Sequence, residues 1–380
     1  MSNIRLHDDY NLTELEILAL NGRLNLSDGH ARQKLTPSQE KIIDLLPDIF
    51  RASAMESPMT VENTLHATFL GALGQPSHQL LNGRIRTCYS SSVAMEILAR
   101  ALSDSVRSVA LVHPTFDNIA DILLGNGLNL LPIREQQVFD DIESFDIPTE
   151  ADCLFITTPN NPTGRVLNAA ALARIADECA ARRIILALDT SFRGFDERAC
   201  FDHYAILEGS TARYVVIEDS GKLWPTLDAK VGLLAYSKNL DLPIDRIYTD
   251  ILLGVSPFIM ALVTSFAADA IDGGLHQLRA EIRERRTAVR DILKDGPGVS
   301  FPDADSSISV ERLELSEQSA TAFWRRLRAE GIDTLPCPPF YWADRSRGDR
   351  YLRIALARPA DVVAAAASGI KEALIGWRRS

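Results

Sequence analysis

The sequence predicts an α/β protein in which a large domain with a mostly parallel β-sheet carries a smaller α+β domain. Apolar runs typical of buried strands alternate with helical patterns over residues 41–236, an order that specifies a parallel sheet with helices on both faces. A second, shorter set of strands and helices follows in residues 300–380. A chain of 380 residues is also too long for one simple core, which favours two domains.

This pattern divides the chain into three parts. Residues 1–40 form a polar N-terminal arm with a short amphipathic segment, 12–20, and a turn-rich stretch, 25–32. An arm with so little core of its own usually packs over another domain or a neighbouring subunit, and here we expect a lid over a site. The large domain covers residues 41–275 and the small domain residues 276–380.

The strands of the large domain are predicted from short runs of β-branched, aliphatic and aromatic residues that end in turn residues. In chain order they cover 84–88, 106–113, 152–159, 183–189, 214–217 and 229–236. Helical patterns cover 41–73, 93–100, a segment ending near 125, then 167–182, 247–270 and 277–293. In the small domain we expect strands at 307–313 and 351–356 and helices at 317–330 and 359–377.

Composition excludes several classes of protein. A hydrophobic fraction of 46% and a charged fraction of 24% are those of a soluble globular protein. The net charge of -11 argues against nucleic acid or an anionic membrane as a partner. No spacing of side chains indicates a metal site. The cysteines are scattered and odd in number, so we expect them to be reduced: Cys88, Cys153, Cys179, Cys200 and Cys337.

The N-terminus does not have the pattern of a secretory signal. Acidic residues, among them Asp8, Asp9, Glu14 and Glu16, lie in and around its first apolar patch. No apolar run approaches the length of a membrane span. We therefore expect a cytoplasmic protein.

Lys222 is the candidate chemical centre. It follows the buried strand 214–217 and the turn Asp219-Ser-Gly221. Ligands of open α/β sheets bind at the carboxyl ends of strands, and a lysine in a partly desolvated site becomes a usable amine nucleophile. The alternative for this segment alone is an ordinary solvated loop lysine.

Other polar and aromatic residues also fall at the carboxyl ends of predicted strands: Ser90, Ser91, Ser92, Phe116, Asn161 and Asp189. The serines open a helix, where backbone N–H groups, hydroxyls and the helix dipole can hold a phosphate, although simple N-capping explains them equally well. Because these ends meet at one edge of the sheet, we expect a ligand crevice there.

Two further residues have a functional and a structural interpretation. His30 lies in the turn-rich part of the arm, where it could face a site or have no role. Arg353 lies inside a strand pattern, where a long cation needs an anionic partner or an exit to solvent at a sheet edge.

The ordered set Asn161-Pro-Thr-Gly164, Asp189, Lys222 and Lys230 resembles the pyridoxal-phosphate (PLP) enzymes of the aspartate aminotransferase fold, also called fold type I. The resemblance covers about residues 40–380 and implies a seven-stranded, mostly parallel sheet. It also implies that Lys222 binds the cofactor covalently and then acts as general acid and base.

The same resemblance implies further cofactor contacts. Asp189 would pair with the pyridinium nitrogen, Asn161 would hydrogen-bond the 3-oxygen and Phe116 would stack on the ring. The phosphate would be held by Ser90, Ser91, Ser92 and Lys230. Arg353 would bind the α-carboxylate of the substrate as a bidentate fork, which explains an arginine within a strand.

Three positions depart from the aminotransferase pattern. Phe192 stands where a tyrosine usually donates to the 3-oxygen, a donor for which Ser191 can substitute. Asp219 stands where a serine often binds the phosphate, so its carboxylate needs a cation nearby. Lys230 stands where an arginine is usual; a lysine keeps the positive charge but lacks the bidentate guanidinium.

The whole chain resembles the PLP-dependent arginine oxidases and hydroxylases. The motifs are Asn11-Leu-Thr-Glu-Leu-Glu16, Leu26-Ser-Asp-Gly-His-Ala-Arg32, Cys88-Tyr-Ser-Ser-Ser-Val93, His113-Pro-Thr-Phe-Asp-Asn-Ile119 and Glu218-Asp-Ser-Gly-Lys-Leu-Trp-Pro225. The resemblance implies a homodimer that oxidises L-arginine with O2 to 2-oxo-arginine and, in the hydroxylases, 4-hydroxy-2-oxo-arginine. Ammonia and hydrogen peroxide are released, and the setting is specialised metabolism such as antibiotic biosynthesis.

In this family the arm supplies substrate contacts. Glu16 and Asp28 would bind the guanidinium, which cannot be deprotonated and must be met by carboxylates. Thr13 and Asp219 would assist them, and His30 would lie over the substrate as a base for the addition of water at Cγ.

Two other functions remain open from the sequence. One is an ordinary PLP aminotransferase, which needs a 2-oxo acid acceptor and consumes no O2. The other is a non-catalytic PLP-binding regulator, although no helix-turn-helix precedes residue 40 and the charge is acidic.

Overall fold

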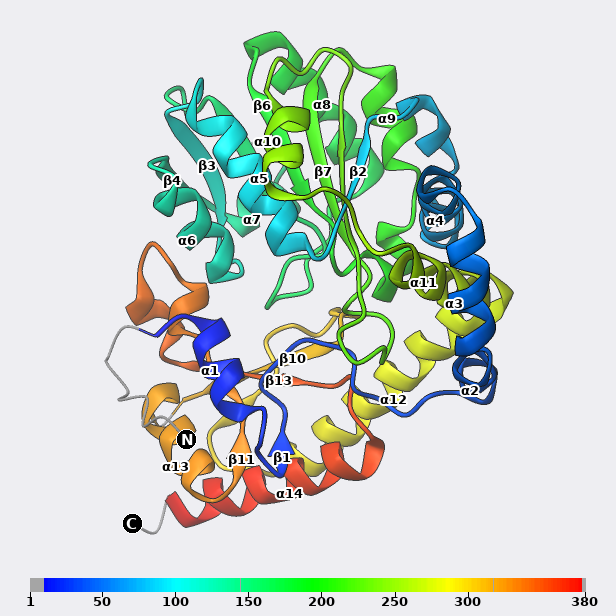
Figure 1. Ribbon diagram of the computed structural model, residues 1–380. Coiled ribbons are helices and arrows are strands. Elements are labelled where there is room, and N and C mark those ends of the chain that lie inside the picture. Colours follow the sequence, from blue (N-terminus) through cyan, green and yellow to red (C-terminus); the bar gives the residue numbers. More distant parts are fainter. Residues whose placement is uncertain (1–9, 144, 317, 378–380) are drawn as a thin grey trace.

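A seven-stranded β-sheet with helices on both faces forms the large domain (Figure 1). This computed structural model describes residues 10–143, 145–316 and 318–377. The strand order is β2-β8-β7-β6-β5-β3-β4, and β8 alone runs in the opposite direction to the other six strands. The strands are β2 (Ile85–Cys88), β3 (Ser108–His113), β4 (Asn129–Arg134), β5 (Cys153–Thr157), β6 (Ile185–Asp189), β7 (Arg213–Asp219) and β8 (Gly232–Tyr236). The prediction of a mostly parallel seven-stranded sheet is confirmed.

Strand β4 was not predicted from the sequence. It forms the edge of the sheet beside β3 and contains Pro132. A proline argues against a central strand but is tolerated at an edge, where its missing N–H costs no ladder hydrogen bond. Its half-exposed residues also lack the continuous apolar run that reveals the inner strands.

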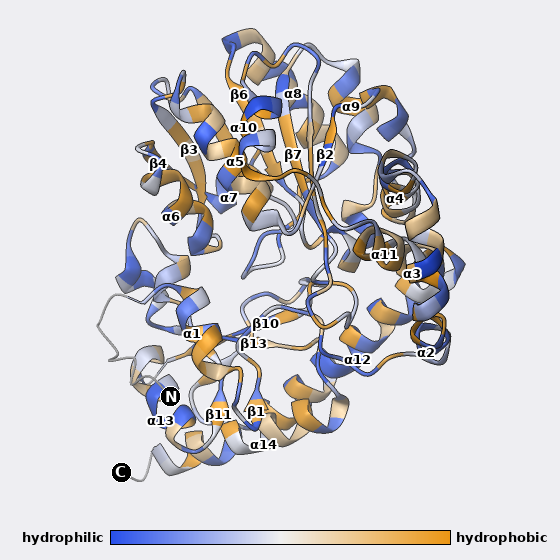
Figure 2. Ribbon diagram, in the orientation of Figure 1, coloured by the Kyte–Doolittle hydropathy of each residue, from blue (hydrophilic) through white to orange (hydrophobic). Residues whose placement is uncertain are grey.

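The sheet separates two apolar cores because successive side chains of a strand point to opposite faces. In β7, Tyr214 and Val216 belong to one core, whereas Val215 and Ile217 belong to the other. Figure 2 shows the hydrophobic central strands between the helical layers. The helices are α2 (Pro37–Asp44), α3 (Leu46–Met55), α4 (Pro58–Ala72), α5 (Ser91–Ser103), α6 (Asp117–Gly125), α7 (Glu135–Phe139), α8 (Ala169–Arg182), α9 (His203–Gly209), α10 (Ile244–Ile251), α11 (Pro257–Asp269) and α12 (Leu275–Leu293). The region predicted as helical over 41–73 is thus three helices that begin at 37, and each of them, α2, α3 and α4, carries proline in its first turn.

The small domain contains an antiparallel sheet in the order β12-β13-β10-β9. Its elements are β9 (Val299–Ser300), β10 (Val310–Leu315), α13 (Ala320–Ala329), β11 (Ile332–Asp333), β12 (Leu335–Pro336), β13 (Tyr351–Ala355) and α14 (Ala360–Trp377). Strand β10 therefore begins later than predicted. Short 3-10 helices occur at Pro76–Leu81, Arg193–Phe195, Glu197–Ala199, Pro338–Phe340 and Arg345–Gly348, and a π-helical segment occurs at Ala270–Gly274.

The arm is fastened to the small domain. It contains α1 (Leu12–Ala19) and β1 (Leu24–Asn25), and β1 pairs in parallel with β11. Figure 1 shows the arm in blue beside the strands of the small sheet. Three predicted segments lie partly outside the described residues: the arm at residues 1–9, the helix 317–330 at Glu317, and the small domain at residues 378–380. The boundary between the two domains at residue 275 stays a prediction.

One stretch, Pro257–Leu293, is long and apolar enough to cross a membrane by length and composition alone. Its apolar side chains, among them Leu262, Val263 and Phe266, are buried in the protein core. The stretch consists of α11 and α12, which meet at a kink at Asp272 and Gly273, and α11 is a core helix.

Gly232, the first residue of β8, fixes the position of the α5 N-terminus. A Cβ at this position would lie 2.4 Å from the carbonyl carbon of Ser90 and 2.6 Å from the nitrogen of Ser91. These are backbone atoms, so they cannot rotate away. Only glycine lets β8 and the start of α5 approach this closely.

We predict that Gly232→Ala destabilises the protein by about 1–3 kcal/mol, because the added methyl group overpacks a backbone contact. Gly71→Ala is the matched control: Gly71 lies inside α4 with nothing within 4 Å of its added Cβ. Alanine is favoured over glycine there by about 0.5–1 kcal/mol, so this control should be at least as stable as the wild type. Urea unfolding measures both, and an unchanged midpoint for Gly232→Ala contradicts the prediction.

Candidate active site

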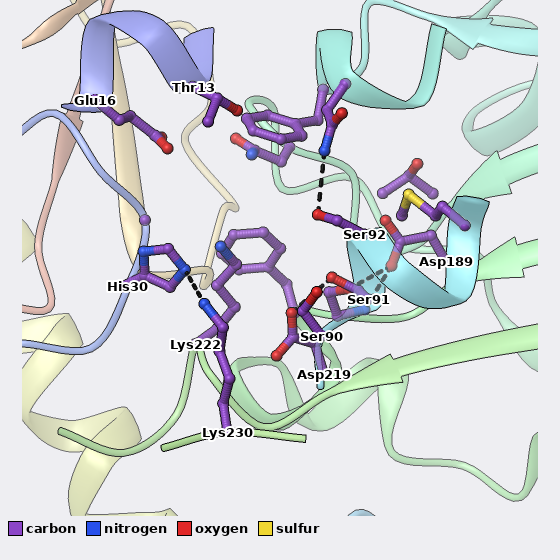
Figure 3. Close-up of a pocket in the computed structure, with 18 of the residues that line it drawn as sticks. Thr13, Glu16, His30, Ser90, Ser91, Ser92, Asp189, Asp219, Lys222 and Lys230 are labelled. Atoms are coloured by element: carbon purple, nitrogen blue, oxygen red, sulfur yellow. Dashed lines mark hydrogen bonds between the residues drawn. The ribbon is translucent and has the colours of Figure 1, made fainter. Parts of the chain in front are cut away.

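A cavity of about 220 Å³ lies where the carboxyl ends of the large sheet face the arm and β13 (Figure 3). Each of the predicted site residues except Asp28 lines it. The lining residues are Thr13, Glu16, Gly29, His30, Ser90, Ser91, Ser92, Met95, Phe116, Asn118, Thr157, Asn161, Asp189, Ser191, Phe192, Asp219, Lys222, Lys230 and Arg353.

Gly29, Met95, Asn118 and Thr157 are the lining residues that the sequence left without comment. Thr157 is the last residue of β5, and Asn118 belongs to the first turn of α6, so both lie at the predicted edge. Asn118 Nδ2 donates a hydrogen bond of 3.1 Å to Ser92 Oγ. The position of these two at strand and helix ends is a signal that could have identified them.

The N-terminus of α5 forms a small polar cradle. Ser90 is the N-cap and accepts from Val93 N at 3.3 Å. Ser91 Oγ donates to Asp219 Oδ2 at 2.6 Å, and Gly221 N donates to Asp219 Oδ1 at 2.6 Å. Asp219 is buried. Its carboxylate accepts the hydrogen bond from the Ser91 hydroxyl that an anion bound at this helix N-terminus would otherwise accept.

Asp189 ends β6 as a buried carboxylate. Ser191 donates to its Oδ1 twice, from the backbone N at 3.0 Å and from Oγ at 2.5 Å. Burial raises the pKa of Asp189 to about 6, although the two hydrogen bonds from Ser191 lower it. A buried acid of this kind gains most from a cationic N–H partner, because that partner stabilises its charged form.

Arg353, on β13, brings the arm and the two sheets together. Its Nη2 donates to Glu16 Oε1 at 3.2 Å and to the carbonyl oxygen of Ser27, and its Nη1 lies 3.5 Å from Asn161 Oδ1. The guanidinium also lies over the Phe340 ring, 5.3 Å from its centroid. Its buried Nε has no hydrogen-bond partner within the described residues.

Glu16 reaches this cavity because α1 is held at its N-terminus. Asp117 Oδ2, at the start of α6, accepts from Leu12 N at 2.7 Å. The side chains of Leu12 and Leu15 are buried in the main core. A carboxylate at a helix N-terminus satisfies a free N–H group and interacts favourably with the helix dipole.

Asp28 is the one predicted residue outside the lining. Its carboxylate forms ion pairs with Arg358 at 3.0 Å and Arg32 at 3.3 Å. It already binds two guanidinium groups of its own chain, and its contact with the guanidinium of a substrate stays a prediction.

The residues around the cavity fit a pyridoxal phosphate. Lys222 offers an amine, Asp189 a buried acceptor for a protonated ring nitrogen and Asn161 an amide for the 3-oxygen. Ser90, Ser91 and Ser92 at the helix N-terminus, together with Lys230, would hold the phosphate. Asp219 would then have to release the Ser91 hydroxyl.

Comparison with known proteins gives the class of the chain. Residues 63–370 match the family described as aminotransferase class I and II. The chain belongs to this family, whose members use pyridoxal phosphate.

Among individual proteins, the chain is similar to MppP, whose structure was determined after soaking with the product 2-ketoarginine. The identity is 48%, the match covers 92% of this chain and 99% of that one, and the TM-score is 0.90. LysN, an α-aminoadipate aminotransferase from Thermus thermophilus complexed with N-(5'-phosphopyridoxyl)-L-leucine, shares the fold at 17% identity, with a TM-score of 0.76 over 96% of this chain and 95% of that one.

A probable N-succinyldiaminopimelate aminotransferase, DapC, from Mycobacterium tuberculosis is 26% identical over 238 residues. That match spans 56% of this chain and a little over half, 57%, of the relative.

Asp117 should make stability depend on pH. Burial raises the pKa of Asp117 from 3.8 to about 7, although the Leu12 N–H lowers it. The folded protein therefore holds a proton that the unfolded chain releases, and stability should fall as pH rises from about 4 to about 7. Asp117→Asn keeps an acceptor for Leu12 N but cannot ionise.

We predict that the Tm of the wild type minus the Tm of Asp117→Asn is largest near pH 4 and falls by a few degrees toward pH 8. The exposed Asp44→Asn serves as the control and should show no such trend. A constant difference would mean that Asp117 is ionised in the folded protein throughout this range, and a difference that grows with pH would mean that folding lowers its pKa.

Proposed function

We propose that this protein is a PLP-dependent oxidase that converts L-arginine and O2 to 2-oxo-arginine, ammonia and hydrogen peroxide. The observation that carries the proposal is the 48% identity with MppP over nearly the whole chain. The MppP structure was determined after soaking with the product 2-ketoarginine, which is the product proposed here. We further propose that part of the product is 4-hydroxy-2-oxo-arginine. The sequence alone leaves an oxidase that forms only 2-oxo-arginine open, because the two kinds of enzyme share their cofactor residues and the arm would control the outcome.

The charges of the cavity support a substrate with a carboxylate at one end and a cation at the other. Arg353 and Glu16 offer the complementary charges, and they pair with each other at 3.2 Å. L-Arginine would replace this pair by two new ones, because its carboxylate suits the Arg353 fork and its guanidinium suits Glu16. Thr13 and Asp219 line the same cavity and would assist.

When bound, PLP supplies a ring that accepts electrons from the substrate Cα. Lys222 would hold the cofactor and move the Cα proton, and Asp189 would keep the ring nitrogen protonated. Phe116 would stack on the ring, and Ser191 would stand in for the phenol that Phe192 lacks. For the hydroxylated product, His30 would take a proton from the water that adds at Cγ.

The molecular setting is part of the same proposal. We propose a homodimer that acts in the cytoplasm and supplies an oxidised arginine to specialised metabolism such as antibiotic biosynthesis. The net charge of -11 supports small-molecule rather than nucleic-acid partners.

Oxygen uptake separates the oxidase from an aminotransferase. Purified protein with PLP and L-arginine, without any 2-oxo acid, should consume O2 at an electrode and form hydrogen peroxide. Lys222→Ala should reduce the rate by roughly 10²–10⁴-fold, because it removes the positioned acid and base. The exposed Lys238→Ala is the matched control and should retain the wild-type rate. Turnover that requires a 2-oxo acid and leaves O2 unchanged would identify an aminotransferase.

The two products differ in oxygen stoichiometry. Each 2-oxo-arginine requires one O2 and one water molecule and yields one hydrogen peroxide, whereas each 4-hydroxy-2-oxo-arginine requires two O2 and two water molecules and yields two hydrogen peroxides. Mass spectrometry in ¹⁸O-labelled water should place the label on C4 of the hydroxylated product.

Glu16→Gln should raise the KM for L-arginine by roughly 10–100-fold, because a charge-assisted hydrogen bond contributes about 1.5–3 kcal/mol. Glu14→Gln is the control on the same helix: Glu14 is exposed, and glutamine can take its place in the capping box with Asn11. Steady-state kinetics measures both variants. Equal KM values for the two would remove Glu16 from the substrate contacts.

A further inference from the structure

Asp28 is held rigidly in the arm although it does not line the cavity. Its carboxylate is almost fully buried and pairs with Arg358 Nη2 at 3.0 Å and Arg32 Nε at 3.3 Å. Asn25 Nδ2 donates to Oδ2 at 3.3 Å, and His30 N donates to Oδ1 at 3.1 Å. Four groups thus fix one carboxylate in one orientation.

The imidazole of His30 lies between this carboxylate and the cavity. Its Nδ1 is 3.5 Å from Asp28 Oδ1, and its Nε2 is 2.9 Å from Lys230 Nζ (Figure 3). An ammonium group has donors and no acceptor, so Nε2 must be the acceptor in the contact with Lys230. The proton of the neutral ring is then on Nδ1, where it faces Asp28.

The charges around His30 favour the neutral ring. The Lys222 ammonium is the main cause that lowers the pKa of His30, followed by burial, and Lys230 adds to them. The hydrogen bond to Asp28 opposes this change. The His30 hydrogen bond and the charges of Arg358 and Arg32 hold the pKa of the Asp28 carboxyl well below its usual range, although burial raises it. Asp28 therefore stays ionised beside Nδ1, 3.5 Å away, without taking its proton.

We propose that Asp28 is a positioning residue for His30, whose carboxylate fixes the Nδ1–H tautomer and turns a basic Nε2 toward the cavity. The inference rests on the proposed function, in which His30 acts as the base. A carboxylate behind a histidine has two effects: it selects the tautomer and stabilises the imidazolium that forms when the ring takes a proton. Positioning His30 in this way is a role for Asp28 that needs no contact with the substrate.

The contact with Lys230 adds a condition to this role. A phosphate bound near Lys230, as predicted, competes with His30 Nε2 for the ammonium donors. Nε2 is then free to accept a proton from water, while Asp28 continues to hold Nδ1. The base would thus become available only in the loaded enzyme.

Nitrogen NMR of the PLP-loaded enzyme tests the tautomer directly. With ¹⁵N-labelled histidine, the His30 signals are identified by their loss in His30→Asn. We expect a protonated Nδ1 and an unprotonated Nε2 at alkaline pH. A proton on Nε2 would overturn the proposal, and because the wild type is measured, the result does not depend on how well a variant folds.

A double-mutant comparison tests the link to turnover. Asp28→Asn should lower the ratio of hydroxylated to unhydroxylated ketone at least about tenfold, since a positioned general base contributes roughly 10²–10⁴-fold. In a His30→Asn background the same change should have no further effect, because Asp28 acts through His30. Additive losses would mean that Asp28 acts independently. Asp44→Asn controls for the loss of an aspartate elsewhere.

These outcomes separate the two proposals. If the wild type forms no hydroxylated ketone, the proposed hydroxylation fails, and the NMR measurement still decides whether Asp28 holds Nδ1–H. If Asp28→Asn binds PLP with an unaltered absorption spectrum and keeps the wild-type product ratio while His30→Asn loses it, the proposed base stands and the positioning role of Asp28 is wrong.

Discussion

The arrangement of the site depends on one buried guanidinium, that of Arg353. Removing such a charge from water is costly unless partners replace the lost hydration. Here the partners come from the arm, through Glu16 and the Ser27 carbonyl, and from the large domain, through Asn161. Since Arg353 itself belongs to the small sheet, its need for partners draws the three parts of the chain to one point. A substrate carboxylate can satisfy the same need.

Much of the fold and most of the site were predictable because they follow from local rules. Inner strands carry continuous apolar runs, and residues at their carboxyl ends converge on one edge, which placed Lys222, Asp189 and Asn161 together. Strand β4 escaped prediction because its proline and its exposed edge hide the strand pattern.

The partners of Asp28 could not be predicted for a different reason. The sequence shows a carboxylate beside a turn but does not show which cation will reach it. Arg358, 330 residues away along the chain, meets it only after folding. Partners that distant in sequence are set by tertiary structure, and no local pattern encodes them.

Two segments of the arm are attached to different domains. Strand β1 pairs with β11 of the small domain in a separate two-stranded sheet, whereas the first turn of α1 is hydrogen-bonded to Asp117 of the large domain. The short segment between them spans the cavity and carries Glu16. A rotation of one domain relative to the other would therefore act on α1 and on Glu16. The position of Glu16 is thus tied to both domains through these two attachments.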